Sequence, residues 1–274
     1  MSLSPAAGPD LFIVERVTFV YRGTTAQVLA SADLRLPRGR RICVVGRNGS
    51  GKSTLLYLLG LLCEARLQHG RITCHLPGHD PIAYDQLTPA ARNELRGQRF
   101  GFVLQDAYLL PQLTCLENLA LPLLLQGTPP EAALARAAAL LREAGGVDLA
   151  ALADRRVDTL SGGQRRMMGV LRAILHDPDV VFADEPTQSL DVNYAPRVLN
   201  LLDAWQRAGA EDRPRTLVMV LHEPAVIHER ADAVVVLGPG GPRQPSPIPL
   251  AEIERKAQAD GISPTEQIRR WISE

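Results

Sequence analysis

The chain of 274 residues is 46% hydrophobic, which is enough to bury the core of one domain with at most a small additional lobe. Its 30 basic and 30 acidic residues balance to a formal net charge of +0, so the chain lacks the basic excess typical of nucleic-acid-binding domains. No apolar run approaches the roughly 20 residues of a membrane-spanning helix, and the N-terminus shows no signal-peptide pattern. The four cysteines lack C-x-x-C spacing, so we expect reduced thiols and a cytoplasmic chain.

Two segments near the N-terminus, Leu11–Val20 and Val28–Leu36, are rich in β-branched and aromatic residues and flank a short Gly/Thr turn. This pattern predicts an antiparallel pair of strands. Tyr21 follows the first segment. An aromatic residue at a strand end is ordinary by itself, but Tyr21 stands about 25 residues before a glycine-rich motif and is placed to stack on an adenine ring. Both interpretations stay open.

That glycine-rich motif, G-R-N-G-S-G-K-S, lies between the apolar segments Arg41–Val45 and Leu55–Cys63. It fits the P-loop pattern G-x-x-x-x-G-K-[ST], in which a strand, a loop and a helix wrap backbone N–H groups around nucleotide phosphates. Lys52 is one of only two lysines, with Lys256, and we expect its compact ammonium to act in catalysis at the β- and γ-phosphates. The motif predicts phosphate or metal contacts from Gly46, Asn48, Gly49, Ser50, Gly51, Lys52, Ser53 and Thr54.

The middle of the chain, residues of about 106–165, is predicted to form a helical lobe inserted into an α/β core. Thr114 and Glu117 match a capping box at the start of a helix over Leu116–Gln126. Pro122 inside that segment is expected to kink or split it. An alanine-rich helix follows.

Strands alternate with helices on both sides of this lobe, which predicts a parallel sheet. The predicted strands are Phe100–Leu104, Asp179–Ala183, Thr216–Leu221 and Ala233–Leu237. Polar residues follow three of them directly, namely Gln105, then Asp184 with Glu185, and then His222. A lone acid pair or a lone histidine at such a place is often structural. Because the carboxyl ends of parallel strands meet at one edge, we expect these side chains to cluster there.

The C-terminal part of the chain divides by composition. We expect one nucleotide-binding domain over residues 1–237 and a linker over 238–249, which holds five prolines and three glycines. Residues 250–274 then predict two short helices with apolar stripes, either a hairpin packed on the body or a separate partner-binding device.

The order and spacing of these motifs resemble the ATP-binding subunits of ABC transporters over roughly residues 11–237. The most diagnostic feature is Leu-Ser-Gly-Gly-Gln at 160–164, which ordinary P-loop proteins lack. Residues 102–122 are similar to the subgroup of lipoprotein-release, macrolide-efflux and cell-division ATPases, although Gln188-Ser189 replaces its usual Gly-Asn. The resemblance implies an α/β P-loop NTPase fold with a mostly parallel sheet, an N-terminal antiparallel β subdomain and an inserted α-helical lobe.

The resemblance also implies roles for single residues. Ser53, Gln105 and Asp184 look like the family's Mg²⁺ shell, partly through water. Glu185 would orient or deprotonate the attacking water, and His222 would contact the γ-phosphate and hold Glu185. Family members bind two ATP molecules in a head-to-tail dimer. The residues expected to act on the nucleotide of the other subunit are Ser161, Gly163, Gln164 and Asp191.

The function implied is an ATP hydrolase that powers a separate transmembrane permease for export or extraction. We expect this permease to dock near Gln105, Tyr108 and Leu109 and hold the chain at the inner face of the cell membrane. A related possibility is mechanotransmission, in which the same dimer works a membrane partner without transport. The main alternative is a soluble ABC-type ATPase of DNA repair or translation. Its usual coiled coils, zinc modules and second ATPase half are missing from the sequence, and the neutral charge disfavours nucleic acid.

Overall fold

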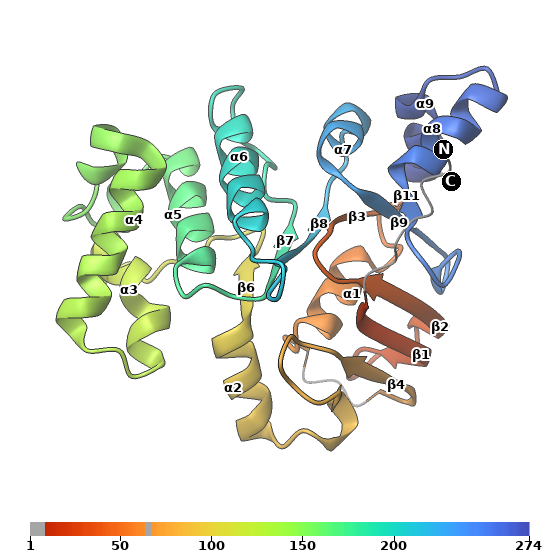
Figure 1. Cartoon of the computed structure of the whole chain (residues 1–274), viewed down its shortest axis with the longest axis horizontal. Helices are drawn as coiled ribbons and strands as arrows, with labels where there is room; N and C mark the ends of the chain where they lie inside the picture. The colour runs from red at the N-terminus through yellow and green to blue at the C-terminus, as the bar shows by residue number, and fades with distance from the viewer. Residues whose placement is uncertain (1–8, 64–66, 274) are drawn as a thin grey trace.

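The computed structural model describes residues 9–63 and 67–273 of the chain, which form two β-sheets (Figure 1). The smaller sheet is antiparallel, with the order β2-β1-β4-β5. Its strands are β1 (Asp10–Val20), β2 (Gln27–Pro37), β4 (His69–Cys74) and β5 (Ile82–Ala83). The predicted antiparallel pairing of the first two segments is confirmed.

The larger sheet has the order β10-β9-β3-β8-β7-β6, and its strands from β9 to β6 run parallel. These strands are β9 (Ala233–Gly238), β3 (Arg41–Val45), β8 (Thr216–Val220), β7 (Val180–Asp184) and β6 (Phe100–Val103). They are almost entirely buried, as parallel strands are when both faces of the sheet are covered. The predicted α/β class is confirmed, and the carboxyl ends of β3, β6, β7 and β8 share one edge of the sheet.

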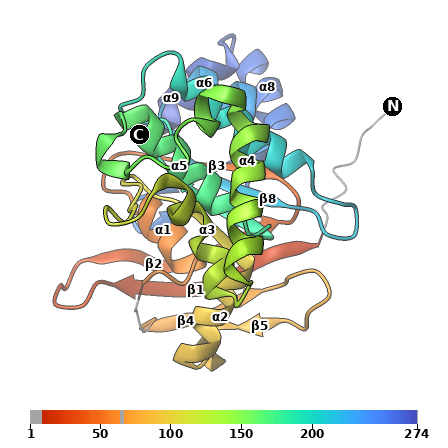
Figure 2. The ribbon, with the colours of Figure 1, turned by 90° about the vertical axis from the view of Figure 1, so that its left-hand side faces the viewer.

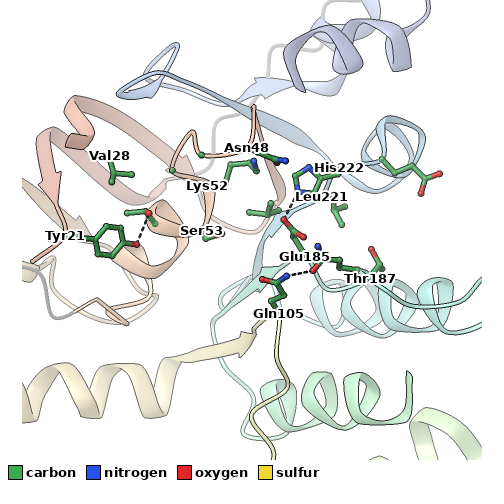
Figure 3. Close-up of a pocket in the computed structure, with 16 residues that line it drawn as sticks. Tyr21, Val28, Asn48, Lys52, Ser53, Gln105, Glu185, Thr187, Leu221 and His222 are labelled. Atoms are coloured by element: carbon green, nitrogen blue, oxygen red, sulfur yellow. Dashed lines mark hydrogen bonds and ion pairs between the residues drawn. The ribbon is translucent and has the colours of Figure 1, made fainter. Parts of the chain in front are cut away.

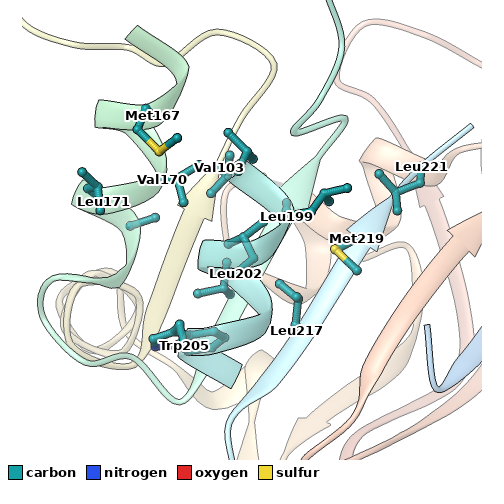
Figure 4. Packing of buried hydrophobic residues seen from close by; sticks show 14 of the residues in the cluster. Val103, Met167, Val170, Leu171, Leu199, Leu202, Trp205, Leu217, Met219 and Leu221 are labelled. Atoms are coloured by element: carbon teal, nitrogen blue, oxygen red, sulfur yellow. The ribbon is translucent and has the colours of Figure 1, made fainter. Parts of the chain in front are cut away.

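Alternate residues of β7 face two separate hydrophobic cores. Val180 and Phe182 belong to the core that also contains buried residues of α1 and of the antiparallel sheet. Val181 and Ala183 belong to the core under α5 and α6, where helix side chains meet those of β8 (Figure 4). The covering helices are α1 (Lys52–Leu59), α5 (Gly162–Ile174) and α6 (Tyr194–Arg207). Because both faces are buried, a one-residue slip would exchange the two cores, and this fixes the register.

The helix after the P-loop is shorter than the apolar run that predicts it. α1 ends at Leu59, and the chain then turns through Gly60 into Leu61, which has a left-handed φ of 58°. A Cβ at Gly60 would lie 2.5 Å from the ring of Phe102, so only glycine lets the end of α1 approach β6 this closely.

The helical lobe lies to one side of the parallel sheet, at the left of Figure 1 and toward the viewer in Figure 2. Its helices are α3 (Cys115–Leu125) and α4 (Pro130–Ala150), while α2 (Pro89–Arg99) leads into β6 and short 3₁₀ turns occur at Tyr84–Gln86 and Val157–Thr159. The capping box of Thr114 and Glu117 is confirmed. α3 continues through Pro122 as one helix, so the predicted split does not occur. Buried Leu119 and Ala120 hold this helix against the core, which offsets the one backbone hydrogen bond that proline removes.

The C-terminal segment stays close to the sheets. Residues 238–249, expected as a linker, contain β10 (Gly241–Pro242) and β11 (Ile248–Pro249), and both pair with β9. Backbone hydrogen bonds also join this segment to β2, from Ala30 N to Gly240 O at 2.6 Å and from Arg35 N to Pro245 O at 2.7 Å. The segment therefore ties the two sheets together.

The last helices form a pair beside α7, at the upper right of Figure 1. The three helices are α7 (Pro224–Arg230), α8 (Leu250–Ala259) and α9 (Pro264–Ser273). Ile253, Ile268 and Trp271 are buried at this contact. Across residues 9–63 and 67–273, every helix is too short or too polar to cross a membrane.

Candidate nucleotide-binding and catalytic site

Lys52 is held in place by the backbone of its own loop. Its Nζ donates hydrogen bonds to the carbonyl oxygens of Gly46 at 3.0 Å and Arg47 at 2.9 Å. The residue is 6% exposed, and this burial lowers the pKa of the ammonium, while the Glu185 and Asp184 carboxylates oppose the shift. The loop therefore presents a fixed cation at the N-terminus of α1, where the helix dipole also favours an anion.

The loop conformation depends on its glycines. Gly51 has a φ of +93°, and a Cβ there would lie 2.8 Å from Cγ1 of Val28. A Cβ at Gly46 would lie 2.4 Å from the carbonyl oxygen of Leu237. The Ser50 hydroxyl inside the loop is buried, without a hydrogen-bond partner among the described residues. A phosphate oxygen is the kind of acceptor that would satisfy this hydroxyl.

Asp184, the last residue of β7, accepts a hydrogen bond on each carboxylate oxygen. Ser53 Oγ donates to Oδ1 at 3.1 Å, and the Tyr57 hydroxyl donates to Oδ2 at 2.9 Å. Burial, followed by the bond to Asp184, raises the pKa of Tyr57 above its usual range. The P-loop pattern does not single out Tyr57. The sequence feature that could have pointed to Tyr57 is its position four residues after Ser53, which puts both side chains on one face of α1.

The contact between Ser53 and Asp184 suits Mg²⁺. This ion takes oxygen ligands in octahedral geometry and commonly uses one or two carboxylates together with substrate phosphates. Over the described part of the chain, no three His, Cys, Asp or Glu side chains converge to form a metal site by themselves. A hydroxyl and one carboxylate, completed by phosphate oxygens and water, therefore fit the group better than an all-protein cage.

Gln105, the third residue expected at the metal, is bonded to another glutamine. Its Nε2 donates to Oε1 of Gln188 at 2.5 Å, and Gln188 N donates to the carbonyl oxygen of Glu185 at 3.1 Å. The bond leaves Oε1 of Gln105 as the acceptor atom of that side chain. It joins the loop after β6 to the loop after β7, a pairing that no local sequence pattern predicts.

Glu185 and His222 meet at the ends of neighbouring strands. His222 Nε2 lies 2.7 Å from Oε1 of Glu185. Glu185 adopts a left-handed φ of 49°, and its N–H donates to the carbonyl oxygen of Val220 at 3.2 Å. Such a conformation is uncommon for a long side chain and is typical of functional sites.

An open cavity of about 860 Å³ runs along this edge of the sheet (Figure 3). In Figure 3, P-loop residues lie on one side of it and the residues after β6, β7 and β8 on the other. The expected residues that line it are Tyr21, Asn48, Gly49, Gly51, Lys52, Ser53, Thr54, Gln105, Glu185 and His222. Further residues in its wall are Val28, Thr187, Gln188, Val220, Leu221 and Glu223. The size suits a nucleotide.

Tyr21 reaches the same cavity with its hydroxyl hydrogen-bonded to Thr54 Oγ1 at 2.9 Å. Its ring packs edge-on against Phe19 and the residue is 40% exposed, so one part of the aromatic surface remains accessible. This geometry accommodates the predicted adenine contact, which stays a prediction.

The residues expected to act in trans lie outside the cavity lining and have local roles. Ser161 Oγ accepts a hydrogen bond from Gln164 N at 3.2 Å, and Gln164 Oε1 accepts one from Ser161 N at 2.9 Å, which caps α5. Asp191 Oδ1 accepts from Tyr194 N at 3.0 Å. A Cβ at Gly163 would lie 2.6 Å from the Tyr194 ring. The start of α5 is thus a formed helix N-terminus that does not contribute to the cavity of its own chain.

Comparison with known proteins agrees with this geometry. The model of the ABC transporter family matches residues 29–188. The lipoprotein-releasing system ATP-binding protein LolD of Legionella pneumophila is 36% identical over 217 residues, which is 79% of this chain and 89% of that protein. The macrolide export ATP-binding/permease protein MacB 1 of Aeromonas hydrophila is 36% identical over 231 residues, or 81% of this chain. The match spans only 33% of that longer protein.

Solved structures give the same result. A dimeric post-hydrolysis state of the ATP-binding cassette MJ0796, bound to ADP and Pi, superposes with a TM-score of 0.73 at 27% identity. The alignment covers 87% of this chain and 98% of that one. The family match spans more than half of this chain, and the relatives and the superposition cover about four fifths of it or more. The chain therefore belongs to the ABC transporter family of ATP-binding proteins.

Proposed function

We propose that this chain is the ATP-binding and ATP-hydrolysing subunit of a transport system whose membrane-spanning part is a separate polypeptide. The observation that carries the proposal is the convergence of a buried lysine, Glu185 and a histidine on one cavity. Asp184 stands behind this cavity and is bonded to Ser53, which lines it. The Leu-Ser-Gly-Gly-Gln segment at 160–164 forms the capped start of α5 and stays outside this cavity. These are the parts needed for phosphoryl transfer to water between two subunits.

Binding of ATP uses the P-loop side of the cavity. Lys52 and the loop N–H groups bind the phosphates, and each hydrogen bond to such charged groups contributes about 1.5–3 kcal/mol. Ser53, Asp184 and Gln105 would hold a Mg²⁺ ion, which would neutralise charge on the phosphates. Tyr21 contacts the adenine ring.

Hydrolysis uses the opposite side of the cavity. Glu185 orients the attacking water and accepts its proton, a contribution that is typically about 10²–10⁴-fold in rate. His222 holds the Glu185 carboxylate through the 2.7 Å contact and lies beside the position expected for the γ-phosphate. Water attacks the γ-phosphorus, the bond to the bridging oxygen breaks, and ADP and inorganic phosphate are released.

The active form is a homodimer in which each site is completed by the partner. Ser161, Gly163, Gln164 and Asp191 stand outside the cavity lining of their own chain. The first three form the N-terminus of α5, which suits a γ-phosphate. The MJ0796 structures, to which this chain is similar, are dimeric.

The membrane partner docks on the loop after β6, next to Gln105 and Leu109, at the inner face of the cell membrane. Tyr108 in this loop is 66% exposed with a left-handed φ of 43°, and Leu110 is 45% exposed. Exposed apolar side chains beside a cavity are a common feature of protein interfaces. A second cavity adjoins this loop and the start of α5.

Export or release of a substrate from the membrane is the favoured activity, because the relatives are a lipoprotein-releasing and a macrolide export protein. A soluble ATPase of DNA repair or translation is not favoured, since those relatives are named for lipoprotein release and macrolide export. The neutral net charge also gives no reason to expect nucleic acid.

The test is purification of the full chain from detergent-solubilised membranes of cells that contain its partners. We expect a transmembrane protein to co-purify, and its recovery to fall with Tyr108→Ala but not with Arg269→Ala, which changes a residue exposed on α9. An active ATPase that recovers no membrane protein would contradict the proposal. A partner that stimulates hydrolysis without moving a substrate would indicate mechanotransmission.

A further inference from the structure

We propose that Tyr57 is a positioning residue for the metal. Its hydroxyl holds one oxygen of the Asp184 carboxylate, so that the other oxygen faces Ser53 and the cation, and this sets the affinity of the site for divalent cations. The inference rests on the proposed function, because the metal is expected to bind together with ATP. The P-loop pattern ends before position 57 and requires no aromatic residue there.

The placement of Tyr57 follows from the helix. Ser53 and Tyr57 are four residues apart on α1, so both side chains project from the same face. α1 lies against β7, and Asp184 ends that strand with 3% of its surface exposed. The carboxylate is therefore held between two hydroxyl groups of one helix, at 3.1 Å from Ser53 Oγ and 2.9 Å from the Tyr57 oxygen.

The two hydroxyl groups differ in what a cation does to them. Ser53 is itself an expected ligand, so its hydrogen bond to Oδ1 would give way to contacts with a bound cation. The bond from Tyr57 ends on the other oxygen and does not compete. It therefore persists and keeps the carboxylate from rotating. Loss of a hydrogen-bond partner behind a metal ligand typically weakens metal affinity by about 10–100-fold.

The chain offers a matched control in Tyr84, which lies in a 3₁₀ turn and contacts the same helix. The Tyr84 hydroxyl donates to the carbonyl oxygen of Leu59, the last residue of α1, at 2.6 Å. Each of the variants Tyr57→Phe and Tyr84→Phe removes one phenolic oxygen. Tyr57 is part of α1, whereas Tyr84 donates its hydrogen bond to the last residue of α1. Only Tyr57→Phe removes a bond to a metal-binding carboxylate.

The experiment measures Mn²⁺ binding to the full chain by electron paramagnetic resonance, in the presence of a non-hydrolysable ATP analogue. For Tyr57→Phe we expect the dissociation constant of Mn²⁺ to rise about tenfold. Tyr84→Phe should bind Mn²⁺ like the wild type. The Mg²⁺ concentration for half-maximal ATP hydrolysis should rise by a similar factor with Tyr57→Phe, and excess Mg²⁺ should recover most of the lost rate.

The outcomes separate this inference from the proposed function. A folded Tyr57→Phe variant with unchanged Mn²⁺ affinity would overturn it, and so would an equal loss in both tyrosine variants, since the effect would then belong to the packing of α1. Thermal unfolding shows whether both variants fold. If the wild type binds no Mn²⁺ with the nucleotide and hydrolyses no ATP, the proposed function itself fails before the variants are compared.

Discussion

Glu185 and His222 are joined across the ends of β7 and β8, with His222 Nε2 at 2.7 Å from Oε1 of Glu185. The backbone N–H of Glu185 donates to Val220 O, and its φ of 49° aims the side chain away from the line of the strand. The carboxylate is thus fixed by a strand end, an uncommon backbone conformation and an imidazole. Such preorganisation is what a group that orients water requires.

Glu185→Gln should abolish turnover without loss of ATP binding. The amide keeps the size of the side chain but cannot accept a proton, so we expect the hydrolysis rate to fall by about 10²–10⁴-fold. Steady-state phosphate release and equilibrium ATP binding measure the two effects. Glu211→Gln, at an exposed position after α6, is the control. Hydrolysis within threefold of wild type in Glu185→Gln would exclude this residue as the base.

Ser161→Ala should impair hydrolysis while leaving ATP affinity of the monomer nearly unchanged. Removal of one hydrogen bond to a phosphate costs about 1.5–3 kcal/mol, which corresponds to a loss of roughly tenfold or more. Thr114→Ala is the matched control, because Thr114 caps α3 with the same 3.2 Å bond length that Ser161 makes at α5. Both variants lose a cap worth about 1 kcal/mol.

Sedimentation of these variants with ATP, in a Glu185→Gln background, provides the second measurement. We expect an ATP-dependent dimer with Thr114→Ala and a weakened one with Ser161→Ala. Equal hydrolysis and equal dimerisation in the two variants would show that Ser161 serves only its own helix.

Local patterns predict most of the fold and many members of the site. The P-loop, the strand ends at Glu185 and His222, and the capping box at Thr114 are each encoded by neighbouring residues, and the structure contains them. The spacing of hydrophobic residues, the turn residues and the helix caps each depend on a few consecutive positions, so one sequence is enough to identify them.

Features that depend on tertiary contact are not predictable in this way. Tyr57 and Gln188 acquire their partners only when α1 meets β7 and when two loops meet at the sheet edge. The close approach of Phe102 to Gly60, just after the end of α1, likewise depends on how α1 packs against β6. Residues 238–249 are rich in proline and glycine, yet they pair with the exposed edge of β9. In each case a distant segment decides the outcome.

Gln188→Ala should lower the hydrolysis rate by about 2–10-fold, because it removes one hydrogen bond that orients Gln105, worth about 0.5–1.5 kcal/mol. The loss should be largest at low Mg²⁺, where the Gln105 oxygen matters most for binding. Gln188→Glu keeps the acceptor atom and should retain more activity than Gln188→Ala. If the two variants behave alike across a Mg²⁺ titration, the bond to Gln105 has no part in the site.

Acidification should destabilise the fold partly through His176. Its Nε2 lies 3.1 Å from the carbonyl oxygen of Phe100, and burial lowers the pKa of this histidine in the folded state. Below the ordinary histidine pKa of about 6.5, the unfolded chain then binds more protons than the folded chain. Below a pH of about 6.5, the free energy of unfolding therefore falls as the solution becomes more acidic.

His176→Gln keeps a donor for the Phe100 carbonyl but cannot titrate, so it should lose less stability than the wild type between pH 7.5 and pH 5.5. His69→Gln, at an exposed position in β4, should keep the pH dependence of the wild type. Denaturant unfolding at both pH values measures the difference, and the comparison between variants cancels the contribution of the carboxylates. Identical pH dependence in His176→Gln and the wild type would mean that His176 takes up its proton in the folded chain as readily as in the unfolded one.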